Sequence, residues 1–251
     1  MTVCGPKDDT VDVEEFAGNR LFTKEFVMLH QAAIGQLVWK DTLGAFYDDP
    51  GNVEGMRWAT GVLVADDLFL TAGHNFRNLD LRDGVLRPRK NRSLQIIEPP
   101  EIATNMIVSF NYQFDEARKL RPEIRLPVVE LLEYFKNDLD FAVVRLQGTP
   151  GLQFGFKKAA SADAIPNDPA CIIQHPKGKP KRVDNGPVSD VNSKVISYQD
   201  IDTFAGSSGS PLINADGDII GIHTHPGCDP MGVGSNHGVP ISAIKAVSAY
   251  L

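Results

Sequence analysis

Short apolar stretches, separated by turn-forming residues, recur along the chain. In its first part they lie at residues 33–39, 58–64, 68–71, 94–98, 106–110, 128–132 and 141–144. Apolar runs of this length, bounded by Gly, Pro, Asn and Asp, are typical of β-strands. Strands that follow one another without long helices between them favour a closed β-barrel over a βαβ arrangement. Residues 115–120 are expected to add one helical turn.

The second half continues the pattern after a stretch rich in glycine and proline. Strands are predicted at residues 170–174, near Val188 and at 195–198, and residues 210–214 and 218–223 flank a turn and predict a hairpin. The chain then ends in a segment with Ser242 as a candidate N-cap and with apolar residues at helical spacing, which predicts a C-terminal helix.

These patterns divide the chain into four parts. We expect an irregular, polar N-terminal arm over residues 1–32, a first β-barrel over 33–147, a linker over 148–156, and a second β-barrel with the C-terminal helix over 157–251.

Composition limits the classes of partner. The 251 residues are 42% hydrophobic, which suits a turn-rich globular protein, and the formal net charge of −7 argues against nucleic acid. No apolar run approaches the length of a membrane span or of a signal-peptide core, so we expect no membrane partner, and we expect a monomer. The protein is then either cytoplasmic as written or a secreted, mature form whose leader has been removed.

Three cysteines, Cys4, Cys171 and Cys228, are spread widely over the sequence. An odd number at such distances makes a disulfide framework improbable. We therefore predict that the protein has no structural disulfide.

One polar, glycine-flanked segment, residues 202–211, indicates a nucleophile. Ser208 lies between Gly206 and Gly209 and is followed by an apolar run. A serine hydroxyl needs a base to take its proton and amide donors to stabilise the oxyanion that forms. Glycine permits the tight backbone that would point the amides of Gly206 and Ser208 at one oxygen. The alternative is an ordinary Ser/Gly turn between two strands.

A base and an orienting carboxylate for Ser208 have candidates upstream. His74 directly follows the apolar run that ends at Leu70-Thr71, and Asp140 precedes the strand candidate at 141–144. The separations, 140 − 74 = 66 and 208 − 140 = 68 residues, leave one barrel-sized segment on each side of the aspartate. The order His, Asp, Ser is one of those in which a catalytic triad occurs.

The segments Thr71-Ala72-Gly73-His74, Asp140-Phe141-Ala142 and Gly206-Ser207-Ser208-Gly209-Ser210-Pro211 resemble the signatures of chymotrypsin-fold serine peptidases. Asp202-Thr203-Phe204 before the serine and Gly221-Ile222-His223-Thr224 after it are similar to the glutamyl-endopeptidase (V8-like) branch. The resemblance runs from about Ala33 to the C-terminus. It implies an all-β fold of two six-stranded antiparallel barrels with a C-terminal helix and a peptide or protein substrate, without a cofactor or catalytic metal.

The resemblance also assigns roles. Ser208 is expected to attack the peptide carbonyl, His74 to act as general base and acid, and Asp140 to hold the imidazole, with the amides of Gly206 and Ser208 as the oxyanion hole. Thr224 occupies the place where the family usually has a serine that supports the aspartate.

The residues expected at the specificity pocket point to two different substrates. Asp202, six residues before Ser208, matches the carboxylate with which trypsin-like enzymes bind Lys or Arg. Thr203 and His223 match the residues that V8-like enzymes place around a substrate glutamate. A buried aspartate facing a substrate glutamate would be costly, so cleavage after Glu requires Asp202 to point away from the pocket or to be neutralised. We predict cleavage after Glu, with cleavage after Lys or Arg as the alternative.

Two other kinds of function stay open. A protein that kept the fold but lost catalysis would be a binding module. A zinc site is also conceivable, because residues of the types that zinc accepts lie close together near the end of the chain: His223, His225, Cys228 and His237. Their spacing is not one that recurs in zinc sites.

Overall fold

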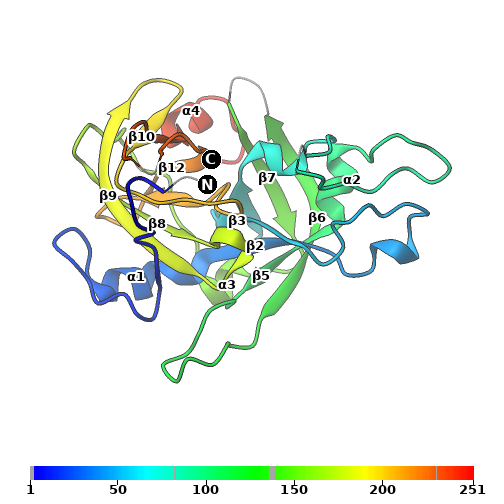
Figure 1. The fold of residues 1–251 in the computed structure, drawn as a ribbon, viewed down its shortest axis with the longest axis horizontal. Helices are drawn as coiled ribbons and strands as arrows, with labels where there is room; N and C mark the ends of the chain where they lie inside the picture. Colours follow the sequence, from blue (N-terminus) through cyan, green and yellow to red (C-terminus); the bar gives the residue numbers. More distant parts are fainter. Residues whose placement is uncertain (1–2, 82, 136–138, 230) are drawn as a thin grey trace.

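The computed structural model describes residues 3–81, 83–135, 139–229 and 231–251. Two β-barrels lie next to each other, the first in cyan and green and the second in yellow and orange in Figure 1. The all-β prediction with two six-stranded antiparallel barrels is confirmed.

The first barrel closes in the order β2-β3-β4-β7-β6-β5. Its strands are β2 (Ile34–Trp39), β3 (Arg57–Leu63), β4 (Leu68–Thr71), β5 (Met106–Phe110), β6 (Ile124–Phe135) and β7 (Phe141–Leu146). Six of the seven apolar runs at the start of the chain therefore form the barrel. Their inward side chains, such as Phe69, Phe110 and Val144, are fully buried.

Two local predictions in this half are wrong. The run at 94–98 forms no strand: only Ile96 makes a bridge, to Arg89, and the Leu94 side chain is 93% exposed. The chain instead enters helix α2 (Pro99–Thr104), whose prolines suit a first helical turn. Residues 115–120 form the tight end of a hairpin and not a helical turn, with a bridge between Phe114 and Leu120.

The second barrel is built from strands that pair in the order β9-β10-β13-β12-β11-β8, and β8 closes it on β9. The strands are β8 (Pro169–Gln174), β9 (Arg182–Val191), β10 (Ile196–Tyr198), β11 (Pro211–Ile213), β12 (Ile219–His225) and β13 (Asn236–Pro240). The sequence pattern missed β13, because its polar and glycine residues carry no apolar alternation.

The N-terminal arm is more ordered than expected. It contains β1 (Val11–Asp12), which pairs with β9, then α1 (Lys24–His30) and the 3-10 turn η1 (Gln31–Ala33). Thr23 caps α1 by accepting a hydrogen bond from the Phe26 amide, and Val27 is fully buried. One apolar face of α1 packs on the core, which explains why a mostly polar sequence folds here.

The C-terminal helix α4 (Ile241–Lys245) exists, but its start was misassigned. Pro240 is the N-cap position, so Ser242 lies inside the helix and caps nothing. Short turns complete the fold: η2 (Leu43–Ala45), η3 (Gly73–Phe76), α3 (Gly151–Phe154) and η4 (Pro176–Gly178). Across the described ranges, the helices are all too short or too polar to cross a bilayer.

A buried lysine joins the arm to both barrels. The Lys181 ammonium donates to the carbonyl and side-chain oxygens of Gln31 and to Oε1 of Gln113, at 2.7, 3.0 and 3.1 Å. Burial lowers the pKa of this lysine to about 7. The last strand of the first barrel ends at Leu146 and the first strand of the second begins at Pro169. The division into residues 33–147, 148–156 and 157–251 stays a prediction.

Candidate active site

The three residues singled out in the sequence lie together between the barrels. His74 sits in η3, directly after β4, Asp140 precedes β7, and Ser208 lies in the loop before β11. The His74 ring bonds Asp140 Oδ2 through Nδ1 at 2.6 Å and Ser208 Oγ through Nε2 at 2.8 Å. This continuous chain from carboxylate to hydroxyl has the geometry that proton transfer from a serine needs.

Asp140 holds the histidine at two points. Its Oδ1 also accepts the backbone N–H of His74 at 2.7 Å, and the residue is only 5% exposed. Burial by itself would raise the pKa of Asp140, but the hydrogen bonds and charge of His74 outweigh it, so the pKa lies below its ordinary value. Asp140 is therefore a carboxylate that fixes both the ring and the tautomer of His74.

The loop that carries Ser208 is shaped by glycine. Gly206 has a φ of +96°, and a Cβ there would lie 2.6 Å from the His175 carbonyl oxygen. The Ser207 hydroxyl accepts the Phe204 amide at 3.0 Å and holds the turn from inside. Within the described chain, the amides of Gly206 and Ser208 make no hydrogen bond. They are thus available to an oxygen bound beside Ser208.

Thr60, a buried residue of β3 in the first barrel, fastens this loop. Its Oγ1 donates to the Gly206 carbonyl at 2.8 Å and accepts the His175 amide at 3.0 Å. Its backbone N–H donates to the Ser208 carbonyl at 3.0 Å. The nucleophile loop of the second barrel is thereby tied to the barrel that carries His74 and Asp140. No sequence motif marked Thr60, since the contact joins residues far apart in the chain.

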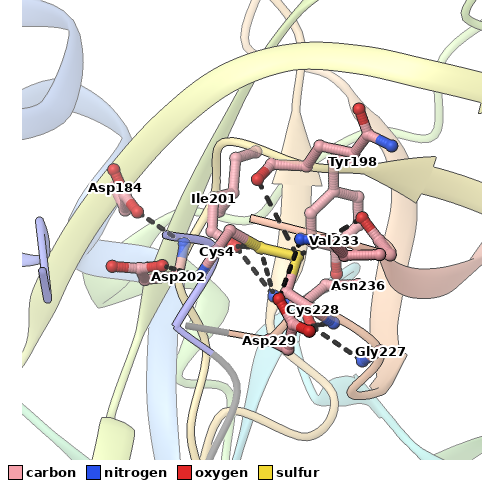
Figure 2. The surroundings of a disulfide bond; sticks show 12 residues. Cys4, Asp184, Tyr198, Ile201, Asp202, Gly227, Cys228, Asp229, Val233 and Asn236 are labelled. Carbon is pink, nitrogen blue, oxygen red and sulfur yellow. Dashed lines mark hydrogen bonds between the residues drawn. A yellow bond between two sulfur atoms is a disulfide. The ribbon is translucent and has the colours of Figure 1, made fainter. Parts of the chain in front are cut away.

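Asp202 faces the N-terminal arm. Its Oδ1 accepts the amide of Cys4 at 2.6 Å and its Oδ2 accepts the amide of Asp9 at 2.8 Å, while its own N–H donates to Asp184 (Figure 2). Asp202 is 2% exposed. Both carboxylate oxygens are therefore occupied by backbone donors of the arm.

A disulfide between Cys4 and Cys228 anchors the same arm, so the prediction of no structural disulfide is wrong (Figure 2). The odd cysteine, Cys171, is a buried free thiol in β8. Asn236 packs beside the bond: its Oδ1 accepts the Gly227 amide and its Nδ2 donates to the Ile201 carbonyl. Cysteine counting failed here because the two partners lie 224 positions apart and come together only when the arm folds back over the second barrel.

The residues expected around the substrate side chain lie close to Ser208. Thr203 and His223 are almost fully buried, and Thr224 follows His223 on β12. The Tyr198 hydroxyl bonds Nδ1 of His223, a contact that the sequence did not predict. Burial lowers the pKa of His223 to about 3, so its ring is neutral near neutral pH. The buried Tyr198 hydroxyl keeps its proton, because burial raises its pKa, and by donating to Nδ1 it leaves the His223 proton on Nε2.

Two pockets meet at Ser208 and His74. One, of about 290 Å³, is lined by Thr224 and His225 of β12. The other, of about 410 Å³, is lined by Trp58 of β3 and by Gly206. The two pockets also share Leu81 and Arg87 in their linings.

The residues of the zinc alternative are not arranged as a metal site. Cys228 is committed to the disulfide, and His237 bonds the Ser197 hydroxyl through Nδ1 at 3.0 Å. Among the residues that the structure describes, no three His, Cys, Asp or Glu side chains are grouped to hold a metal ion.

The sequence profile described as the trypsin-like peptidase domain matches residues 59–222, more than half of the chain. The chain belongs to the trypsin-like peptidase family.

Solved structures have the same fold. A Glu endopeptidase in complex with MPD superposes with a TM-score of 0.60 at 16% identity, over 97% of this chain and 96% of that one. A serine endoprotease from Yersinia pestis gives a TM-score of 0.57 at 16% identity, over 89% of this chain and 64% of that one.

One curated relative also matches. It is the secreted RxLR effector protein 73 of Plasmopara viticola, 30% identical over 131 residues, which make up 47% of this chain. The match spans about a third, 32%, of the length of that relative.

Proposed function

We propose that the protein hydrolyses peptide bonds with Ser208 as nucleophile, His74 as general base and acid, and Asp140 as the residue that orients His74. The observation that carries the proposal is the unbroken hydrogen-bond chain from Asp140 through His74 to Ser208 Oγ. The pKa of Asp140 lies below its ordinary value, so Asp140 is charged and can stabilise an imidazolium.

The reaction would proceed through an acyl-enzyme. Ser208 Oγ attacks the carbonyl carbon while His74 Nε2 takes the hydroxyl proton, and the oxyanion that forms accepts the amides of Gly206 and Ser208. His74 returns the proton to the leaving amine as the C–N bond breaks. Water, activated by the same ring, then hydrolyses the ester and restores Ser208.

We further propose that the residue before the cleaved bond is glutamate. Asp202 supports this assignment because its two oxygens already accept amides of the N-terminal arm. Cleavage after Lys or Arg would need that carboxylate in the pocket. A neutral His223 with its proton on Nε2 offers a donor to a glutamate carboxylate, and the hydroxyls of Thr203 and Thr224 are the other candidate donors.

Labelling with a fluorophosphonate tests the triad. Such a reagent phosphonylates only an activated serine, so we expect one adduct, at Ser208, located by peptide mass mapping. Ser208→Ala should abolish labelling, and His74→Ala should lower turnover by several orders of magnitude while leaving the unfolding curve in place. A wild type that is folded and does not label would reject the peptidase role and favour a binding module.

Paired peptides that differ only in Glu or Arg before the cleaved bond test the specificity. We expect a higher kcat/KM for the Glu peptide, and a loss of that preference in His223→Ala. The matched variant is Asp202→Ser, which releases the arm without touching the proposed donors. A preference for Arg that Asp202→Ser abolishes and His223→Ala leaves intact would establish the trypsin-like alternative instead.

A further inference from the structure

We propose that the larger pocket beside Ser208 is a subsite for a bulky, uncharged side chain, aromatic or branched aliphatic, of the first residue after the cleaved bond. The inference rests on the proposed function, since it assumes that Ser208 becomes acylated. We call this space the leaving-side pocket and define it by Met56, Trp58, Val85, Arg87, Lys177 and Gly206. Its volume of about 410 Å³ is enough for a large side chain and part of the backbone.

Its position assigns it to the leaving segment. The residues proposed to bind the substrate glutamate extend along β12 into the other pocket, which contains Thr224 and His225. The leaving-side pocket contains no residue of β12 within the described chain, and reaches Ser208 from the side of β3 and Gly206. The acyl part of the substrate occupies the β12 side, so the amine that receives the proton of His74 departs towards β3.

Trp58 makes this pocket a rigid one. Its indole Nε1 donates to the Asn75 carbonyl at 3.1 Å, and its ring meets Trp39 edge-on, with centroids 5.9 Å apart. The Arg87 guanidinium lies over its ring, 5.1 Å from the centroid. An aromatic side chain that is fixed in this way and still only partly buried can bind an apolar group with little loss of conformational freedom.

The cationic side chains around the pocket already interact with other groups of the protein. Arg57, at its edge, is ion-paired with Glu123 at 2.6 Å, and the Lys177 ammonium lies 3.7 Å from the centroid of the Phe204 ring. Arg87 is 1% exposed and donates to the Leu79 carbonyl. The pocket also has the apolar surfaces of Met56, Trp58, Leu81 and Val85 and the carboxylate of Asp83 in its lining. The apolar surfaces favour an apolar side chain, and Asp83 disfavours a substrate carboxylate.

Acyl transfer to added amines tests this pocket separately from the rest of the reaction. A glutamyl peptide ester would acylate Ser208, and an amino-acid amide in solution would then compete with water for the acyl group. The amine nitrogen attacks the ester carbon, the bond to Oγ breaks, and His74 carries the amine proton to Oγ. The ratio of amide to acid product, measured by chromatography at equal free-amine concentration, compares how well each amine is captured, because the acyl-enzyme is the same for every amine.

We expect phenylalaninamide and leucinamide to capture the acyl group roughly tenfold or more better than glycinamide at equal concentration. Trp58→Ala should reduce the preference for phenylalaninamide and leucinamide over glycinamide. Val85→Trp, which fills the pocket, should reduce the same preference. Leu152→Ala, at a side chain that is 75% exposed and outside the pocket, is the matched control and should leave the ratio unchanged.

Three outcomes would overturn the proposal. Equal capture of all amines by an active enzyme would overturn the inference alone. A preference for aspartic acid amide would also overturn it, because the pocket would then bind acidic side chains through Lys177 and Arg87. No turnover of any ester by the folded wild type would overturn the proposed function, and the inference with it.

Discussion

Replacing Thr60 by valine should loosen the nucleophile loop while leaving all three residues of the proposed triad in place. Valine keeps the size and branching of threonine but removes Oγ1, which bonds the Gly206 carbonyl at 2.8 Å and the His175 amide at 3.0 Å. His175 is fully buried, so its N–H would lose its acceptor without gaining water. A buried donor left unsatisfied costs roughly 1–3 kcal/mol, and loss of the second bond adds about 1 kcal/mol. We expect a total loss of about 2–4 kcal/mol in the free energy of unfolding.

Urea unfolding followed by tryptophan fluorescence measures this loss, and the fluorophosphonate labelling rate reports the effect on Ser208. Because Gly206 also offers one of the proposed oxyanion donors, we expect labelling to slow by roughly tenfold. Thr60→Ser is the control: it keeps the hydroxyl and loses one buried methyl, at a cost of about 1 kcal/mol. If Thr60→Val and Thr60→Ser behave alike in both measurements, the hydrogen bonds of Thr60 do not hold the loop.

Two further predictions concern stability. Reduction of the disulfide, or Cys4→Ser, should lower the free energy of unfolding by up to about 5 kcal/mol, since the bond closes a loop of 224 positions; a melting temperature that reductant leaves unchanged would contradict this. Burial raises the pKa of Asp184 to about 7, although the amides of Asp202 and Asn185 oppose the shift. Between about pH 4 and 7 folding therefore takes up a proton, so the contribution of Asp184 to stability falls as pH rises, by at most about 4 kcal/mol. In Asp184→Asn this slope should be missing from urea unfolding measured across that range, and a slope equal to that of the wild type would refute the assignment.

The residues of the candidate site could be singled out from the sequence because each of them carries a local signal. The adjacent strand or turn decides the position of each residue: the histidine follows an apolar run, the aspartate precedes one, and the serine lies between glycines. The structure brings Asp140 and Ser208 each within hydrogen-bond distance of the His74 ring. The six apolar runs that form the first barrel were found for the same reason, since burial of a strand leaves a pattern within a few residues.

Contacts between distant segments could not be read in this way. Thr60 has no motif, because its partners Gly206 and His175 lie in the other barrel. The direction of Asp202 depends on an arm nearly 200 positions away, and the sequence alone left both possible substrates open. Strand β13 and helix α1 were missed because tertiary packing, and not local propensity, stabilises them.

The disulfide between Cys4 and Cys228 also determines which fragments can separate after the backbone is cleaved once. Nearly the whole chain lies between its two ends, including every loop that connects the strands of both barrels except the part of the β12–β13 loop that follows Cys228. A peptidase that nicks another copy of itself in one of those loops would leave both pieces covalently joined. The nicked protein would run as one chain in electrophoresis until a thiol reagent is added, and then as two. Cuts on the outer side of either cysteine are the ones that let a fragment leave at once.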